Sequence, residues 1–265
     1  MAVVTTTPPV VTTTPPVVTT TPSVVTTTPP SVVTTTPSVV TTTPLSRDNH
    51  AATDLVGLWP LNSQYGASDT TGNGNDGVAR ATKLAPGPYG DPNGAFLFSG
   101  TANSYLDIPN NGKLDVKYSY TILAHIYPTG WAGPVFNYVG THNQWAVHLW
   151  QTAPQELFMR TVGRDGFFPR FVIAKVLQQN AWNYVGGTYD SSKRVATLWN
   201  NGQAVGEKII CKVPSVATQY PIRVAVRDGD GRYFAGRIAC IQLYDYAMTQ
   251  EPINAARDRC WRRGF

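Results

Sequence analysis

The stretch YSYTILAHIY, residues 118–127, decides the fold class of this chain. Every second residue from Tyr118 to Ile126 is apolar or aromatic, whereas the other face is polar except at Leu123. Side chains of a strand alternate between two faces, so this pattern is typical of a β-strand with one buried face. The stretch therefore predicts a strand of an antiparallel sheet.

Similar short runs rich in Val, Ile, Tyr, Phe and Trp continue along the chain, separated by clusters of Gly, Asn, Asp and Pro. Predicted strands cover residues 55–61, 95–98, 105–108, 118–127, 134–139, 145–150, 157–162, 171–176, 182–189, 195–199, 222–226 and 235–244. So many strands exceed what one sheet holds comfortably. The sequence predicts an all-β domain of two sheets packed face to face.

Two Asn-Gly pairs indicate tight turns, because both central residues of a type I′ hairpin need a positive φ. Asn201-Gly202 lies between two strand-like runs and predicts such a hairpin. Asn111-Gly112 is interpreted in the same way.

The three cysteines are Cys211, Cys240 and Cys260. Cys240 lies in an apolar run, and Cys260 closes a predicted helix over residues 249–260, with Thr249 as N-cap and arginines in its last turn. Folding this helix back onto the strand would bring the two cysteines together, and we predict a Cys240–Cys260 disulfide. Three reduced thiols are the alternative, favoured if the protein stays in the cytosol. Cys211 is left over, either buried or available for an intermolecular bond.

The N-terminal segment differs from the rest, because VVTTTP occurs six times between residues 3 and 44 without a charge or an aromatic ring. Such a segment cannot bury enough apolar surface to fold, and it predicts a disordered, semi-rigid spacer. Its clustered hydroxyls beside proline are typical of O-glycosylated mucin-like stalks. An unmodified disordered tail is the alternative. The predicted organisation is a stalk over residues 1–46, a linker over 47–54, a folded domain over 55–261 and a basic tail over 262–265.

Composition narrows the class of partner. The net charge is +5, yet the basic residues are scattered except for Arg257, Arg259, Arg262 and Arg263. The sequence shows no basic stripe beside stacking aromatics, so nothing in it indicates nucleic-acid binding. No apolar run is long enough to span a membrane. The repeat follows Met1 without a visible signal peptide. The chain is then a piece of a longer secreted protein, an intracellular protein, or one exported by another route, and the mucin-like repeat favours the first.

Six segments occur in the order known for one family. They are LVGLWPL with SDTTGNGNDGV, GAFLFSG with YLDIPNNGKLD, SYTILAHIYP with GPVFNYV, NAWNYVGGTYD, VATLWNNGQAV, and RYFAGRIACIQLYDYAMTQEPI. The chain from residue 55 to 260 thereby resembles the laminin-G-like (LamG) jelly roll of the concanavalin A-like lectin/glucanase superfamily. The resemblance implies a two-sheet antiparallel jelly-roll sandwich with one short C-terminal helix.

The same resemblance implies extracellular recognition of glycans, matrix proteins or receptors, although one fold serves many functions. Cys240 stands where many relatives have an acidic residue. Asn62 stands where a carboxylate often follows the first strand. Both departures count against the calcium site that is usual in the family.

One loop nevertheless has the composition of a calcium site, because calcium prefers carboxylate, amide and carbonyl oxygens. Its candidate ligands are Asp69, Asn73, Asn75 and Asp76. The same residue types favour tight turns on conformational grounds, and a purely structural turn is the alternative. Residues 228–231 have a similar composition, and there a plain hairpin tip is the better interpretation.

Two other chemistries are disfavoured. A retaining glycosidase needs two carboxylates ~5 Å apart, whereas Glu156, Glu207 and Glu251 are isolated in the sequence. The histidines show no metal-binding spacing. His148, which alternates with Trp150, is expected at the surface or in a groove.

Aromatic side chains are the stronger indication of function, since the apolar faces of sugar rings stack on aromatic planes. Trp131, in a Thr-Gly-Trp-Ala-Gly turn, is the first candidate, and Trp145 and Tyr233 are the others. Tryptophans predicted to lie in the core are Trp59, Trp182 and Trp199.

We therefore expect a non-catalytic extracellular recognition or adhesion module that binds a glycan or a matrix protein and is displayed on a mucin-like spacer. A structural matrix component without a specific small ligand is the alternative, for which a spare Cys211 thiol could cross-link chains. Glycoside hydrolysis is the third and weakest hypothesis.

Overall fold

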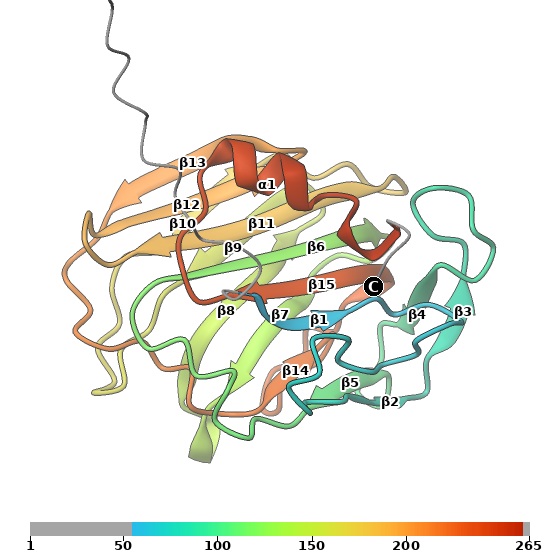
Figure 1. The fold of residues 1–265 in the computed structure, drawn as a ribbon, viewed down its shortest axis with the longest axis horizontal. Helices are drawn as coiled ribbons and strands as arrows, with labels where there is room; N and C mark the ends of the chain where they lie inside the picture. The colour runs from blue at the N-terminus through green and yellow to red at the C-terminus, as the bar shows by residue number, and fades with distance from the viewer. Residues whose placement is uncertain (1–54, 262–265) are drawn as a thin grey trace, which may run out of the picture. The chain divides into compact units, whose positions relative to one another are not determined.

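A computed structural model describes residues 55–261, which fold into two antiparallel sheets and one short α-helix (Figure 1). The eight-stranded sheet has the order β13-β12-β11-β6-β15-β4-β3, and β1 also pairs with β15. Its strands are β1 (Leu55–Trp59), β3 (Lys83–Ala85), β4 (Ala95–Ser99), β6 (Tyr120–Pro128), β11 (Asn183–Asp190), β12 (Val195–Asn200), β13 (Gln203–Ile209) and β15 (Ala235–Tyr244).

The seven-stranded sheet has the order β10-β9-β8-β7-β14-β5-β2. Its strands are β2 (Val78–Arg80), β5 (Tyr105–Ile108), β7 (Gly133–Val139), β8 (Trp145–Ala153), β9 (Glu156–Arg160), β10 (Val172–Lys175) and β14 (Ile222–Val224). The all-β jelly-roll sandwich predicted from the sequence is confirmed. The predicted stalk, linker and basic tail lie outside the described residues.

The core lies between the sheets and follows the strand alternation. In β6, Tyr120, Ile122 and Ala124 point into it, as the sequence predicted. Tyr118 does not belong to this strand, because β6 begins at Tyr120 and the Tyr118 ring is exposed. The predicted strand was therefore two residues too long at its start.

A second apolar cluster covers the outer face of the eight-stranded sheet. Leu123 and Tyr184 on this face pack with Ile253 of helix α1 (Gln250–Ala256). Figure 1 shows α1 lying in front of β11 and β12 on that face. Leu123, the one apolar residue on the predicted polar face of its strand, is apolar because the C-terminal segment buries it.

The C-terminal segment is fixed to this sheet by a disulfide and by side chains. The predicted Cys240–Cys260 bond is present, with the two Cα atoms 5.8 Å apart. The last carbonyls of a helix lack partners within the helix. Here the Tyr184 hydroxyl donates to the Ile253 carbonyl (2.9 Å), and Gln242 Nε2 donates to the Ala256 carbonyl (3.0 Å). Side chains of the sheet thus cap the end of α1.

The helix is shorter than the sequence predicted. It ends at Ala256, so its last turn contains no arginine, and a separate 3-10 turn, η2 (Arg259–Trp261), carries Cys260. Thr249 is the N-cap residue, but its side chain makes no capping hydrogen bond. Packing of Ile253 and Ala256, together with the two bonds at the C-terminal end and without an N-cap side chain, therefore holds this helix.

One of the two predicted Asn-Gly hairpins is confirmed. Asn201 and Gly202 have φ values of 51° and 79° and join β12 to β13. In the other pair only Gly112 has a positive φ, and the loop joins no hairpin. Asn111 instead turns its amide toward the neighbouring loop, where it donates to the Asn73 carbonyl (2.8 Å).

Candidate functional site

The outer face of the seven-stranded sheet carries aromatic rings and arginines where a solvent-facing sheet would ordinarily be polar. In β9, Leu157 and Met159 point into the core, so Phe158 and Arg160 point outward. The loop between β14 and β15 adds two arginines over the same face. We call this set the aromatic–arginine platform, and it consists of Trp145, His148, Trp150, Phe158, Arg160, Phe168, Phe171, Arg227 and Arg232.

The rings of the platform contact one another across neighbouring strands. His148 of β8 stacks on Phe158 of β9 with centroids 5.6 Å apart and planes inclined by 15°. Phe158 stacks in turn on Phe171, at 5.0 Å. Arg232 lies over Trp150, with its guanidinium carbon 4.7 Å from the ring centroid, and Trp150 is almost fully buried. The inner part of the platform is therefore rigid.

Arg160 places a positive charge among these rings. Its guanidinium carbon lies 4.0 Å from the Phe168 centroid and 5.1 Å from the Phe171 centroid. Such contacts are favourable, but they do not neutralise the charge. Its Nε is buried without a hydrogen-bond partner, and burial lowers the pKa of Arg160.

Trp145 forms the rim of the platform. The Arg227 guanidinium carbon lies 3.8 Å from the centroid of its ring, which is partly exposed. A hollow of about 350 Å³ adjoins Trp145 and is also lined by Phe168, Tyr220 and Arg164. Arg164 is held there by its ion pair with Asp115. An aromatic wall beside a fixed charged group is the usual composition of a small-ligand site.

His148 is buried rather than exposed, so its predicted surface position is wrong. Burial, together with the nearby charges of Arg160, Arg227 and Arg232, lowers the pKa of His148 to about 3. Its Nδ1 lies 2.7 Å from the carbonyl oxygen of Ala146. The ring is therefore neutral at physiological pH and serves as an aromatic wall under the arginines.

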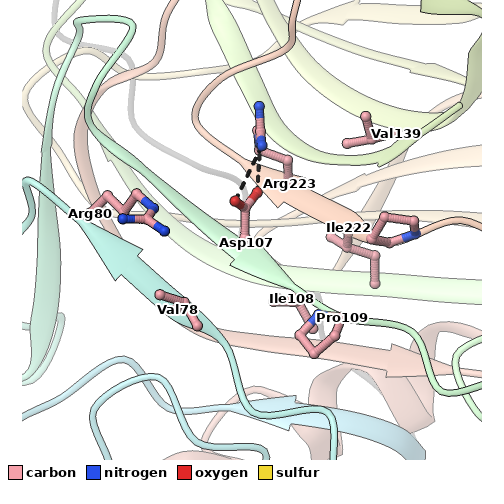
Figure 2. Close-up of a pocket in the computed structure, with 9 residues that line it drawn as sticks. Val78, Arg80, Asp107, Ile108, Pro109, Val139, Ile222 and Arg223 are labelled. Carbon is pink, nitrogen blue, oxygen red and sulfur yellow. Dashed lines mark hydrogen bonds and ion pairs between the residues drawn. The ribbon is translucent and has the colours of Figure 1, made fainter. Parts of the chain in front are cut away.

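A second hollow, of about 360 Å³, lies at the other edge of the sheet, against β2, β5 and β14. Apolar side chains such as Val78 and Ile222 surround it. Figure 2 shows Arg223 bound to Asp107, with Arg80 on the other side of this carboxylate. Arg223 Nε donates to Asp107 Oδ1 at 2.6 Å and Nη2 donates to Oδ2 at 3.2 Å.

A third hollow, of about 180 Å³, lies between the other two. It is lined by the turn that joins β7 to β8 and by Arg227 and Asp228. Val139 lines both this hollow and the one at β2, and Gln144 lines both this hollow and the one at Trp145. The third hollow therefore adjoins each of the other two.

The structure separates the three aromatic residues that the sequence suggested. Trp131 is 74% exposed and precedes β7, whereas Trp145 begins β8, which pairs antiparallel to β7. Because β7 spans seven residues, the two rings lie at opposite ends of this hairpin, roughly 20 Å apart. Tyr233 lies near the Trp131 end, where its backbone packs against Gly133.

Sequence reasoning missed most of the platform. The run Glu156–Arg160 alternates a buried aliphatic residue with an outward aromatic or charged one, and this signal marks Phe158 and Arg160. Phe168 and Phe171 come from an irregular segment and had no such signal. Trp182 was predicted to be core, but it is only half buried and meets Tyr127 edge to face, with centroids 5.7 Å apart.

The four predicted calcium ligands lie in one loop, where hydrogen bonds occupy their side chains. Asp69 Oδ1 accepts from the Leu58 amide (3.2 Å). Asp76 Oδ1 accepts from the Asp69 amide (2.7 Å). Asn75 Oδ1 accepts from the backbone amide of Asn111 in the neighbouring loop (3.1 Å).

The fit of this loop to calcium is poor. Asn73 Oδ1 accepts from the Lys113 ammonium (3.2 Å), a charge that would repel a cation. Asp69 Oδ2 is buried without a hydrogen-bond partner, but calcium takes six to eight oxygens. Calcium here remains a prediction from residue types.

The three glutamates considered for glycoside hydrolysis lie on different elements. Glu156 is on β9 of one sheet, Glu207 is on the edge strand β13 of the other, and Glu251 is on α1. Between residues 55 and 261 no group of three or more His, Cys, Asp or Glu could hold a metal ion. Nor does that part of the chain contain a helix that is long and apolar enough to span a membrane.

Several solved structures with a similar fold are binding domains. The binding domain of Paraclostridial Mosquitocidal Protein 1 matches with a TM-score of 0.62 and 14% identity over 78% of this chain and 52% of that one. The binding domain of botulinum neurotoxin serotype G matches with a TM-score of 0.62 and 10% identity, covering 76% and 50%. The ligand-binding domain of botulinum neurotoxin serotype D, in complex with N-acetylneuraminic acid, matches with a TM-score of 0.61 and 13% identity, covering 78% and 51%.

This chain spans about half the length of these chains, and at such identities the likeness shows the fold alone. No curated protein matches the sequence. A sequence model of the Laminin_G_3 family, described as the concanavalin A-like lectin/glucanases superfamily, matches residues 99–254, which is more than half of the chain. The chain therefore belongs to the laminin-G-like family of the concanavalin A-like lectin/glucanase superfamily.

Proposed function

We propose that this domain is a non-catalytic recognition module that binds a glycan at the hollow beside Trp145. The partly exposed Trp145 ring is the observation that carries the proposal, because Arg227 covers it at 3.8 Å and fixes it beside this hollow. A sugar can stack its apolar face on a fixed aromatic ring at little cost in side-chain entropy. The fold is that of binding domains, one of them solved with N-acetylneuraminic acid, which supports a glycan as ligand.

The substitution Trp145→Ala tests this site. We expect it to weaken glycan binding about 30-fold or more, the size of a contact that dominates an interface. Trp145→Phe keeps an aromatic plane and should retain much of the affinity. The measurement is a glycan array with the recombinant domain, followed by calorimetric titration of the glycans that bind.

Trp131→Ala is the matched control, because Trp131 is also exposed but lies at the other end of the β7–β8 hairpin. It should bind like the unsubstituted domain. If Trp131→Ala abolishes binding and Trp145→Ala does not, the site proposed here is wrong and the one suggested first by the sequence is right. Thermal unfolding of each variant shows whether a loss of binding reflects a loss of fold.

We also propose that the domain acts outside the cell, displayed on the Thr-rich repeat as a glycosylated spacer. The Cys240–Cys260 disulfide supports an oxidising compartment. A structural matrix role is the second candidate, because Cys211 is exposed and carries a free thiol that could cross-link chains. A blank array together with Cys211-dependent dimers on a non-reducing gel would favour that candidate.

A further inference from the structure

We propose that the outer surface of the seven-stranded sheet at β10 binds an extended acidic segment of a partner protein. The inference goes beyond the glycan-binding function proposed above, because it concerns a different class of ligand at another part of this sheet. Six side chains form this surface, which we call the β10 surface, and they are Arg160, Phe168, Phe171, Ile173, Lys175 and Lys208. Of these six, Phe168 alone also borders the hollow beside Trp145.

Strand pairing sets the order of these side chains along β10. Phe171, Ile173 and Lys175 alternate with core-facing residues and therefore point outward. Arg160 of the neighbouring strand lies beside Phe171, with its guanidinium carbon 5.1 Å from the ring centroid. Lys175 lies opposite Glu156. Two residues of a strand span roughly 6.6 Å, so the positions of Arg160 and Lys175 are roughly 13 Å apart along the strand, with Ile173 between them.

The cations of the β10 surface have no internal counterion. Between residues 55 and 261, no carboxylate forms an ion pair with Arg160, Lys175 or Lys208. Lys208 Nζ lies 5.2 Å from the centroid of Phe171, so two cations flank this one ring. Arg160 Nε is buried without a partner, whereas its Nη groups reach the solvent and make no hydrogen bond with a described residue. A ligand carboxylate can therefore bind both Nη groups without displacing an internal partner.

Exposed apolar side chains lie between these charges. Phe168 is 42% exposed and Ile173 is 38% exposed. The six side chains include no hydroxyl, amide or carboxylate, so most hydroxyl groups of a sugar would lose water here without gaining a hydrogen bond. An apolar side chain of a peptide has no such cost and buries the exposed rings. The Phe168 ring lies against Arg160, 4.0 Å from its guanidinium carbon, instead of projecting as an anchor in a bilayer would, which favours a peptide over a membrane.

The spacing along β10 defines the sequence pattern of the ligand. An extended peptide that lies along this strand presents every second side chain to it, at the same interval as the strand itself. The first such side chain meets Arg160 and Lys208, the second meets Ile173, and the third meets Lys175. The expected ligand therefore has an acidic, an apolar and an acidic residue at alternate positions. Because Glu156 lies beside Lys175, the third position contributes less than the first.

An array of synthetic peptides, incubated with the full chain, tests this pattern. In each peptide Thr alternates with three varied positions, and a shuffled peptide of the same composition accompanies it. We expect the strongest binders to have Asp or Glu at the first and third varied positions and Phe, Leu or Ile at the middle one. Shuffled peptides that bind as strongly as the ordered ones would overturn the proposed pattern, and an array without binders would overturn the proposal itself.

Variants of the chain place the binding on the β10 surface. Arg160→Met keeps a long side chain against the rings but removes the charge, and we expect it to weaken the selected peptide about tenfold. Lys208→Gln should weaken it about threefold. Lys83→Gln is the matched control, since Lys83 is also an exposed lysine but lies on the edge strand β3 of the other sheet. It should bind the peptide like the unsubstituted chain.

A double-mutant cycle separates a direct contact from a loss of fold. Replacing the first acidic residue of the peptide by its amide should weaken binding to the unsubstituted chain about tenfold, but should have little further effect on Arg160→Met. Additive effects would show that this carboxylate does not bind Arg160 and would overturn the inference. So would binding to vesicles of phosphatidylserine and phosphatidylcholine that Lys208→Gln weakens while no peptide binds, because the surface would then recognise lipid. Lys208 lies outside the hollow beside Trp145, so Lys208→Gln should bind glycans unchanged, and the two proposals can fail separately.

Discussion

Replacing both half-cystines in the variant Cys240→Ala/Cys260→Ala should lower the free energy of unfolding by about 3 kcal/mol. The bond closes a loop of 20 residues in sequence, and the chain-entropy estimate for such a loop is of this size. The bond also holds the segment whose Ile253 and Met248 cover Leu123 on the outer face of the sheet. Losing the bond lets this segment detach and exposes apolar surface. Urea unfolding followed by tryptophan fluorescence measures the change.

Cys211→Ala is the control, since this thiol is exposed and unpaired. It should leave the free energy of unfolding unchanged. Because the disulfide lies on the eight-stranded sheet and the hollows lie on the seven-stranded sheet, the disulfide variant should still bind glycans at temperatures where it is folded. Equal stability of the double variant and the unsubstituted protein would show that packing of the helix alone holds the C-terminal segment.

The sequence predicted the sandwich because strand alternation is a local property. Tyr120, Ile122 and Ala124 reveal their common face without knowledge of any partner. The disulfide was also predictable, because the pairing needed only one strand and one helix next to it in the chain. The edge strands β2 and β3 were missed, since three residues are too few to show a period.

The candidate site was harder to predict because contacts between distant segments create it. Trp145 was identified by its chemistry, but nothing in the sequence places Arg227 over its ring. The position of the hollow that Val139 borders depends likewise on the pairing of β14 with β5 and β7, which the sequence does not show. Trp131 was favoured because it lies in a turn, yet a turn fixes exposure and says nothing about neighbouring rings. A binding surface on a sheet is a non-local property.

Acid should destabilise this protein from about pH 6.5 downward, because two of its histidines are buried. Burial lowers the pKa of His125 to about 4 and that of His148 to about 3. In the unfolded chain both have ordinary pKa values near 6.5. Below pH ~6.5 the unfolded state therefore binds two protons that the folded state does not bind. The free energy of unfolding is highest above this pH and decreases as the pH falls.

Relative to pH values well above 6.5, the expected loss by pH 5 is about 2 kcal/mol for each histidine, because one pKa unit corresponds to about 1.4 kcal/mol. Urea unfolding at a series of pH values measures it. The pKa values of Asp190 and Asp230 are lowered in the folded state, so their contribution is lost only at lower pH, near and below the ordinary aspartate pKa of about 3.9. These two aspartates therefore do not contribute to the loss that we expect from the histidines above pH 5.

Substitution assigns this loss to the two rings. His125→Gln should halve the dependence on pH above pH 5, because its ring, which lies 2.9 Å from the Arg257 carbonyl oxygen, is then replaced by a group that does not titrate. His142→Gln is the matched control, since His142 is exposed and should leave the dependence unchanged. The comparison uses the slope with pH, so a variant that is less stable at every pH still gives an answer. A free energy of unfolding that stays constant between pH 7 and 5 would mean that both rings accept protons in the folded state, and hence that neither is shielded from water by the aromatic side chains around it.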